Sequence, residues 1–431
     1  MEVKETVIRL MTRLAIQHDA VNLSQGFTDE APIYDMVWGA ISATLGGTPN
    51  GIDNLDELSL GDITELVRQQ GFNDPTSVSL KEVLGVLQNR RDQFNQYSFP
   101  FGLPELRHAI ANYTETFLRF RPDENDEITV VLGASEGMAA TFRAVCEPGD
   151  AVAIIQPFHE IYPAQLAIFG IESRFVTLRE DVAAGTWRLD LNELDDVTKS
   201  PDVKALIFNA PHNPTGKVFD RAELEAVADI CKRNDLTVIT DEIYEHMVFD
   251  GHRHRSLRTL DGMAERTVVV NSISKTGRAT GWRVGWLITP RELTQRVRAI
   301  HDNLAVQAPT PLQKGAVRLL SQDRGAFDAI AAHYLAKREQ LLQGIRSAGF
   351  RASAPEGAYY LFADYTGVSA LGGMTPTDAA MHLITEYGVA TVPGDNFYRV
   401  GNDGDRYLRF AFCRGAETLE EGVRRLGALS A

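Results

Sequence analysis

The feature that most restricts the fold is an alternation of short apolar segments with helical segments through the middle of the chain. Apolar residues recur at helical spacing from Glu105 to Phe120. Runs of strand length follow: EITVVLGA, AVAIIQP, SRFVTL, KALIFNAP, TVITDE, TVVVNSIS and VGWLI. Several of these runs are separated by helical stretches, such as SEGMAATFRAV after the first. This alternation predicts an α/β fold, with a mostly parallel sheet and helices on both of its faces.

Polar residues gather where these predicted strands end. The pieces concerned are GASEG, QPFHE, NAPHNPTG, TDEIY and NSISK. In an open α/β sheet the ligand site lies at the strand ends and in the loops that follow them. We therefore expect the five pieces to meet in one crevice.

The pattern changes near Leu320. A helix is predicted from Ala329 to Gly349 and another from Asp378 to Tyr387, among the strands YYLFADY, VATVP and YLRFAFC. We expect four parts: an N-terminal arm (1–34) that joins a small domain, an insertion (35–92), a large domain with the strand-end site (93–325) and a small C-terminal α/β domain (326–431).

The insertion holds TLGGTPNGIDN and then two short helical patterns, ITELVRQQ and SLKEVLGVLQNRR. It is either a surface decoration or a lid or partner surface, since long excursions from compact domains are often functional.

Composition excludes several classes of partner. A formal net charge of −15 argues against nucleic acid or an anionic membrane as the main partner. Cys146, Cys231 and Cys413 have no metal-ligand spacing, so we expect reduced thiols and no metal site. The charged first twenty residues do not resemble a secretory signal, and no apolar run is long enough to span a bilayer. We expect a cytoplasmic protein.

The chemistry of the polar pieces centres on one lysine. Lys275 lies in SISKTGRATGWRVGW, three residues after Ser272 and eight before Arg283. A lysine amine can form a Schiff base with a cofactor that carries an aldehyde and a phosphate. A pyridine cofactor of this kind also needs an acidic group at its ring nitrogen, donors at its ring oxygen, and hydroxyls, an arginine and a helix N-terminus at its phosphate. The chain offers Asp241, Tyr244, Asn213, Ser272, Arg283 and the GASEG turn for these places.

The ordered set of motifs resembles the fold-type I, class I/II aminotransferases, which use pyridoxal 5′-phosphate. NLSQGF, NQYSFPFGLPELR, PHNPTG, TDEIYEH, SKTGRATGWRVGW and YLRFAFC are most similar to the kynurenine and methionine aminotransferase branch. The resemblance runs from about Asn22 to the C-terminus, apart from the insertion.

The resemblance implies a role for each matching residue. Lys275 would form the Schiff base and move the Cα proton, with Asp241 and Tyr244 as the other catalytic residues. Arg409 would grip the substrate α-carboxylate, beside Gly26 and Asn213. The residues implied in cofactor binding are Ala134, Ser135, Glu136, His159, Asn213, Asp241, Tyr244, Ser272, Lys275 and Arg283. Tyr97 would reach the phosphate in the partner subunit's site, so the resemblance implies a homodimer.

Two positions depart from the family pattern. His159 stands, after Phe158, where relatives commonly place an aromatic ring over the cofactor, and a histidine can stack or transfer a proton. Val306 and Gln307 replace an aromatic pair of the kynurenine branch, which puts an aromatic side-chain pocket in doubt.

The leading prediction is an aminotransferase that converts an α-amino acid to a 2-oxo acid, with a 2-oxo acid as acceptor. The alternative shares the removal of the Cα proton and then performs β- or γ-elimination, replacement or cyclisation on an amino acid with a leaving group. A non-enzymatic regulator on this fold is disfavoured because Lys275 and Arg409 are both present and no basic DNA-binding arm precedes them.

Overall fold

The computed structural model describes residues 5–45, 55–72, 74, 77–88 and 94–430. Its largest element is an eight-stranded sheet in the order β2-β9-β8-β7-β6-β3-β4-β5. The strands are β2 (Ile128–Val131), β3 (Ala151–Gln156), β4 (Glu172–Asp181), β5 (Thr186–Leu189), β6 (Val203–Asn209), β7 (Thr237–Asp241), β8 (Thr267–Ser272) and β9 (Gly285–Ile288). The central strands from β4 to β8 pair in parallel, and β5, β9 and β2 pair antiparallel at the two edges. The predicted fold class is confirmed.

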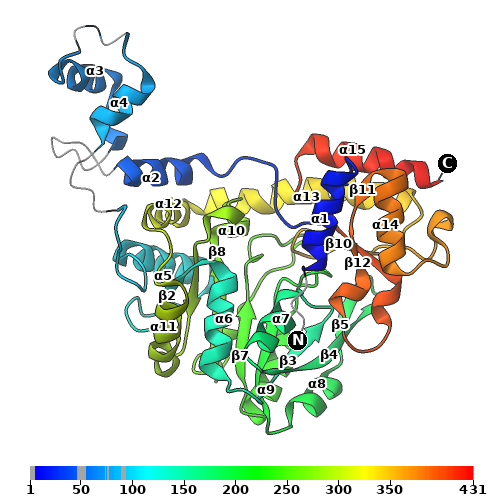
Figure 1. Cartoon of the computed structure of the whole chain (residues 1–431). Coiled ribbons are helices and arrows are strands. Elements are labelled where there is room, and N and C mark those ends of the chain that lie inside the picture. The colour runs from blue at the N-terminus through cyan, green and yellow to red at the C-terminus, as the bar shows by residue number, and fades with distance from the viewer. Residues whose placement is uncertain (1–4, 46–54, 73, 75–76, 89–93, 431) are drawn as a thin grey trace.

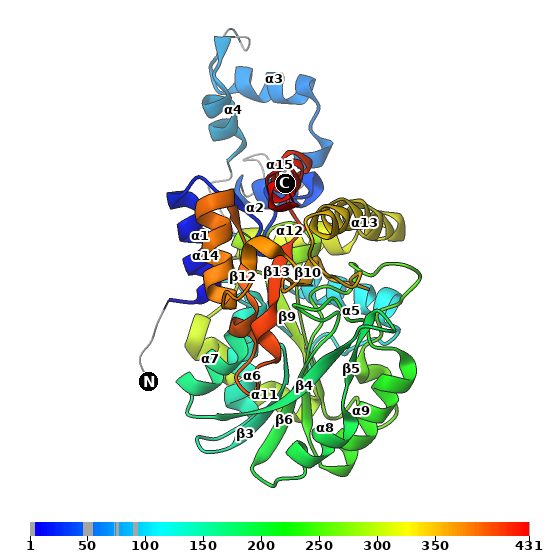
Figure 2. The same cartoon turned by 90° about the vertical axis from the view of Figure 1, so that its right-hand side faces the viewer.

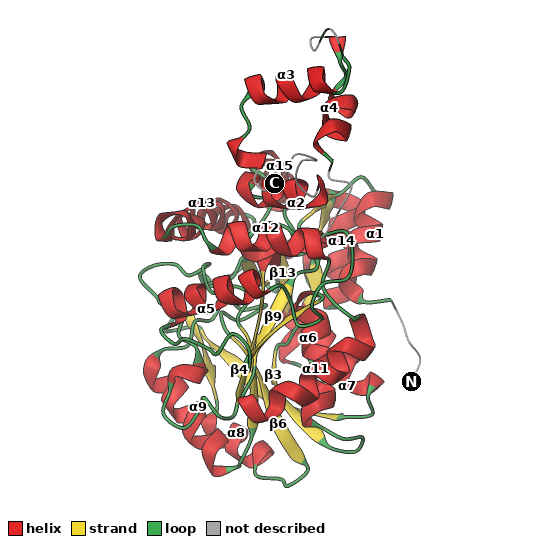
Figure 3. Cartoon of the chain, turned by 90° about the vertical axis from the view of Figure 1, so that its left-hand side faces the viewer, coloured by secondary structure: helices red, strands yellow, loops and turns green. Residues whose placement is uncertain are grey.

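Helices cover both faces of this sheet (Figure 3). On one face Ile154 and Ile207 pack with residues of α6 (Gly133–Val145), α7 (Ile161–Ile168) and α11 (Arg291–Ala305). On the other face Ile155 and Leu206 pack with residues of α8 (Leu191–Thr198) and α9 (Arg221–Arg233). Neighbouring residues of one strand thus enter different cores, which explains why the parallel strands are apolar at nearly every position.

A second unit lies next to the large sheet, between it and the projecting helices α3 (Leu60–Gln69) and α4 (Leu80–Leu87) in the view of Figure 2. Its antiparallel sheet has the order β10-β13-β12, from β10 (Tyr360–Asp364), β12 (Val392–Pro393) and β13 (Tyr407–Ala411). The helices of this unit are α13 (Arg324–Ser347), α14 (Pro376–Tyr387) and α15 (Ala416–Leu426). The N-terminal arm joins it, because β1 (Val21–Asn22) pairs with β11 (Val389–Ala390) and α1 (Val7–Gln17) packs on the same core.

The stretch expected to be an insertion begins with a helix that belongs to the body of the fold. α2 (Tyr34–Leu45) packs on α12 (Thr310–Leu320), and the two helices approach at Gly39 and Gly315. A Cβ atom on Gly315 would lie 2.6 Å from the Met36 carbonyl oxygen, which is too close, so glycine is needed there for this approach. The following helices, α3 (Leu60–Gln69) and α4 (Leu80–Leu87), project beyond α2 (Figure 1).

Capping boxes at Ser59 and Ser79 fix where the two projecting helices begin. Residues 46–54, 73, 75–76 and 89–93 of the expected insertion lie outside the described residues. Its role as a lid or partner surface stays a prediction. No helix in the described ranges is both long enough and apolar enough to cross a membrane.

Candidate active site

A cavity of about 110 Å³ lies at the carboxyl ends of the parallel strands, where the sequence predicts the ligand site. Eight of the predicted site residues line it: Ala134, Ser135, His159, Asp241, Tyr244, Ser272, Lys275 and Arg283. Asp241 ends β7, and Ser272 ends β8 and caps the short helix α10 (Ile273–Thr276) that carries Lys275. The parallel register of the strands is what brings these residues together.

Lys275 is held by the N-terminal arm. Its Nζ atom donates a hydrogen bond to the Gly26 carbonyl oxygen at 2.8 Å, and the Tyr359 hydroxyl donates to the same oxygen at 2.8 Å. Burial lowers the pKa of Lys275 to about 8, although Asp241 opposes this shift. A substantial fraction of this amine is therefore neutral, and able to accept a proton, near physiological pH.

Asp241 has one satisfied and one unsatisfied oxygen. Its Oδ2 atom accepts a hydrogen bond from the Tyr162 hydroxyl at 2.6 Å. Its Oδ1 atom is buried and has no partner among the described residues. Burial raises the pKa of Asp241 to about 6, and the bond from Tyr162 offsets part of that rise. A buried carboxylate oxygen without a partner can accept a hydrogen bond from a cationic N–H donor.

Arg283 and the first turn of α6 form a concave wall of hydrogen-bond donors. Arg283 has a left-handed backbone (φ +56°), and its Nη1 donates to the Thr280 carbonyl oxygen at 2.9 Å. Gly133 (φ +76°) lies under the guanidinium, and a Cβ atom there would overlap it. The backbone N–H groups of Ala134 and Ser135 lie in the first turn, where a helix has no internal acceptors. Such a wall fits a phosphate group.

Glu136 contributes differently from its neighbours. Its Oε2 atom accepts hydrogen bonds from the Leu132 N–H group and from His301, each at 3.0 Å. The Glu136 side chain is thus used within α6 and toward α11, and it does not line the cavity. Only its backbone N–H group remains for the predicted role in cofactor binding.

Arg409 lies on β13, behind the same cavity. Its Nη1 donates to Asn213 Oδ1 at 3.0 Å and its Nη2 to the Ser24 carbonyl oxygen at 2.8 Å. The guanidinium carbon lies 4.3 Å from the Tyr360 ring centre and 4.9 Å from that of Phe397. The residue is 1% exposed and its Nε atom has no partner. No carboxylate of the described chain lies within ion-pair distance, so Arg409 is a buried cation whose counter-ion is missing.

His159 is neutral in this environment. Its Nδ1 atom accepts a hydrogen bond from the Ile161 N–H group at 3.2 Å, which places the ring proton on Nε2. Burial, together with the nearby charges of Arg409 and Lys275, lowers the pKa of His159 to about 3. This chemistry suits a stacking ring better than a general acid.

Tyr97 does not line the cavity of its own chain, and it is 82% exposed. The N–H group of the next residue, Ser98, donates to Gln307 Oε1 at 2.7 Å. Val306 has a positive φ of 64°, and Gln307 N–H bonds to the Ala305 carbonyl oxygen at 2.7 Å, which closes a strained γ-turn. Tyr97 and the Val306 turn thus lie on one surface region.

Three residues of the site were missed by sequence reasoning. Tyr162 binds Asp241, Tyr360 lies between Arg409 and the Tyr244 hydroxyl (3.1 Å), and Asn209 Oδ1 accepts from the Asn213 N–H group at 2.7 Å. No motif marks Tyr162 or Tyr360. The tyrosine pair in YYLFADY was visible only as part of a strand.

Comparisons with known proteins agree with this geometry. The family described as aminotransferase class I and II matches residues 67–426. The probable N-succinyldiaminopimelate aminotransferase DapC of Mycobacterium tuberculosis is 33% identical over 99% of this chain and 96% of its own length. Kynurenine–oxoglutarate transaminase 1 of Homo sapiens is 30% identical over 95% of this chain and 92% of its own.

Solved structures show the same likeness. The N-succinyldiaminopimelate aminotransferase from Mycobacterium tuberculosis superposes with a TM-score of 0.83 at 32% identity, covering 100% of both chains. YbdL from Escherichia coli, whose structure is reported with a methionine aminotransferase function, gives 0.81 at 27% identity over 99% of this chain and 97% of that one.

Proposed function

This chain belongs to the class I and II aminotransferases, a pyridoxal-phosphate-dependent family acting on amino acids, and we propose that it binds that cofactor at Lys275 and an α-amino acid at Arg409. The observation that carries this assignment is a pair of buried charged side chains whose charges are not fully paired within the chain. Asp241 lacks a partner on Oδ1 and Arg409 lacks a counter-ion, and both lie beside Lys275. A cationic ring nitrogen would pair with Asp241, and a substrate carboxylate would pair with Arg409.

The residues present fit the cofactor. Asp241 Oδ1 would accept from the ring nitrogen, and Asn213 and Tyr244 would approach the ring oxygen. Ser135, Ser272, Arg283 and the N–H groups at the start of α6 would hold the phosphate, and His159 would cover the ring. When bound, the cofactor withdraws electrons from the amino acid's Cα and so makes its proton acidic.

Lys275 supplies the proton transfer. Its Nζ atom is buried, its pKa is lowered to about 8 by that burial, and it is oriented by the Gly26 carbonyl oxygen. The amine therefore can take the Cα proton and hold it close to the reacting atoms, away from bulk water. The Tyr359 hydroxyl donates to the same Gly26 oxygen and so helps to hold the group that orients Lys275.

Arg409 orients the amino acid. Asn213 and Ser24 fix the plane of the guanidinium, and Tyr360 and Phe397 flank it. A fixed planar fork binds a carboxylate through two parallel hydrogen bonds, which sets the direction of the Cα–H bond as well as affinity. The substrate side chain contributes nothing to this grip, so the whole class of α-amino acids shares it.

Two further parts of the proposal follow from the family. The acceptor is a 2-oxo acid, and the enzyme is a homodimer in which exposed Tyr97 reaches the partner's site. A cytoplasmic location is proposed separately, from the free thiols of Cys146, Cys231 and Cys413. Support for the dimer is the 82% exposure of an aromatic side chain next to the Val306 turn.

The test is a panel of amino acids mixed with the purified enzyme and 2-oxoglutarate. The panel includes kynurenine, N-succinyldiaminopimelate and methionine, because similar proteins carry these names. We expect conversion of the cofactor to its amine form and one 2-oxo acid released per amino acid, with Lys275→Ala inactive. Product formed without any acceptor would contradict transamination and indicate elimination or replacement.

A further inference from the structure

A second cavity, of about 480 Å³, lies outside the candidate active site and shares no lining residue with it, although its lining includes Glu245, the residue after Tyr244. Its wall is made by three separate parts of the chain: the end of α5 (Pro104–Leu118) with Arg119, the stretch from Glu245 to Thr259, and the start of α13. Cavities of this size accommodate small organic ligands. Nothing in the proposed aminotransferase chemistry uses it.

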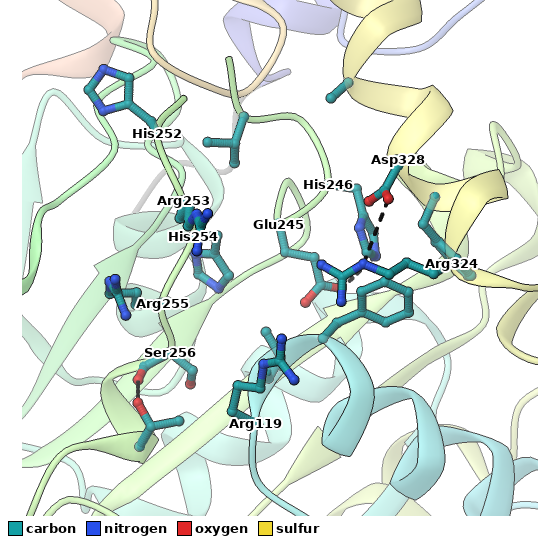
Figure 4. A pocket seen from close by; sticks show the side chains of 16 residues that line it. Arg119, Glu245, His246, His252, Arg253, His254, Arg255, Ser256, Arg324 and Asp328 are labelled. Carbon is teal, nitrogen blue, oxygen red and sulfur yellow. Dashed lines mark hydrogen bonds and ion pairs between the residues drawn. The ribbon is translucent and has the colours of Figure 1, made fainter. Parts of the chain in front are cut away.

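Arginine dominates the lining. Figure 4 shows Arg119, just after the end of α5, and Arg324, at the start of α13, reaching toward the middle of the cavity, with Arg253 and Arg255 on the loop opposite. Arg119, Arg253 and Arg255 make no ion pair with any described residue. The chain has 58 acidic and 43 basic residues, so an arginine has many carboxylates available to pair with. Three arginines left unpaired around one cavity therefore form a local positive field within an acidic protein.

The two carboxylates of the lining do not cancel that field. Asp328 pairs with Arg324 at 3.6 Å, one turn along α13. Glu245 is buried, and its Oε1 atom accepts hydrogen bonds from Tyr113 and from Asn271 Nδ2, the latter at 2.6 Å. Burial raises the pKa of Glu245 to about 7, so much of it is uncharged near neutral pH.

One side of the cavity is apolar and aromatic. Phe117, Phe327 and His246 pack together, with ring centres 4.7 to 4.8 Å apart. Arg324 lies over the Phe117 ring at 5.8 Å. A ligand that matches this lining has several negative charges on one part and a flat or apolar body on another.

We propose that this arginine-lined cavity is a binding site for a small organic polyanion, a phosphate ester or a polycarboxylate, separate from the active site. The ligand would bridge the loop that follows Tyr244 and the first turn of α13, and so would connect the large sheet unit to the C-terminal unit. Binding to the folded protein alone raises its melting temperature.

The test measures binding of inorganic pyrophosphate, ATP and citrate to the cofactor-loaded enzyme by calorimetry and thermal shift. We expect saturable binding of at least one probe and a rise in Tm. Removing charge-assisted hydrogen bonds in the double variant Arg119→Gln/Arg255→Gln should weaken it by about tenfold or more. Arg9→Gln, an exposed arginine of α1 without an ion pair in the described chain, is the matched control and should bind as the parent does.

Two results would overturn the proposal. One is the absence of saturable binding for all three probes up to about 10 mM. The other is affinity that is unchanged in the double variant, or that falls as much in Arg9→Gln. A probe that loses affinity in Arg409→Lys but not in the double variant binds at the active site. This outcome would also overturn the proposal. Because Arg119 and Arg255 are exposed, circular dichroism should show both variants folded.

Discussion

Replacing Arg409 by glutamine tests whether this residue binds the substrate carboxylate or only supports the fold. Arg409 is 1% exposed, its guanidinium has only neutral acceptors in Asn213 and Ser24, and its Nε atom is unpartnered. The Arg409 guanidinium therefore lacks a counter-ion until substrate binds. It becomes a buried ion pair only when a carboxylate binds.

The magnitude follows from that change of state. Breaking one side of a buried, hydrogen-bonded charge pair costs about 3–5 kcal/mol, which corresponds to a fall in kcat/KM of about 10²- to 10⁴-fold. Stability should respond much less. The loss of the bonds to Asn213 and Ser24 destabilises the fold by about 1–3 kcal/mol, but removal of an uncompensated buried charge acts in the opposite direction. We expect the Tm within about 3 °C of the parent.

The assay compares an amino acid with the amine that lacks its carboxylate, in single-turnover measurements of the cofactor spectrum. Arg409→Gln should lower kcat/KM for the amino acid and leave the poor reactivity of the amine nearly unchanged. Arg409→Lys keeps the charge but not the fork, so it should recover only part of the loss.

Arg414→Gln is the matched control. Arg414 is also buried, donates to the Asn22 carbonyl oxygen at 2.8 Å and lies over the Phe27 ring, but unlike Arg409 it is not bonded to Asn213. It should lower Tm more than kcat/KM. If the amino acid and the amine lose the same factor in Arg409→Gln, or if Arg414→Gln is equally inactive, Arg409 only supports the fold and another group binds the carboxylate.

The remaining predictions concern the other side of the cavity. Lys275→Ala should lose the yellow colour and the covalent cofactor that borohydride fixes in the parent; mass spectrometry that finds the adduct elsewhere would contradict this. Asp241→Asn should lower turnover strongly with the fold preserved. Tyr162→Phe should lower turnover less, because it removes only the donor to Asp241 Oδ2. Equal turnover in the parent and both variants would show that Asp241 is not the partner of the cofactor ring. His159→Phe should keep transamination and most of the rate, whereas loss of one limb of the pH profile would indicate proton transfer. His159 has a folded pKa of about 3, below its unfolded value of about 6.5, so the stability it contributes is present above about pH 6.5 and is lost as the pH falls toward 3. His159→Phe should therefore reduce the acid-side slope of unfolding free energy by about 1.4 kcal/mol per pH unit, measured by denaturant titration.

The sequence by itself determined the fold class and the reaction family. Apolar runs of strand length alternate with helical spacing, and this pattern is local, so it can be recognised within a window of some dozen residues. Four of the five polar motifs at the strand ends line one cavity, because parallel strands present the same end to the same edge of a sheet; the fifth, NAPHNPTG, does not line it. Asp241 and Lys275 could be placed for that reason.

Only the tertiary structure decided what each of these groups touches. Asp241 bonds to Tyr162, 79 residues away, and Arg409 bonds to the Ser24 carbonyl, 385 residues away. Glu136 follows Ser135 directly, yet its side chain leaves the cavity for His301. Such contacts depend on how distant segments pack, and no local periodicity records them.

The arginine-lined cavity is the extreme case of that limit. Arg119, Arg253 and Arg324 come from three segments, and each taken alone is an ordinary surface charge. A charge becomes part of a binding site only when folding gathers others of the same sign around one cavity, as it does here although Arg324 keeps its ion pair with Asp328. Sequence order therefore fixed the strand-end chemistry of this enzyme, whereas the second site exists only through packing between segments that the sequence keeps far apart.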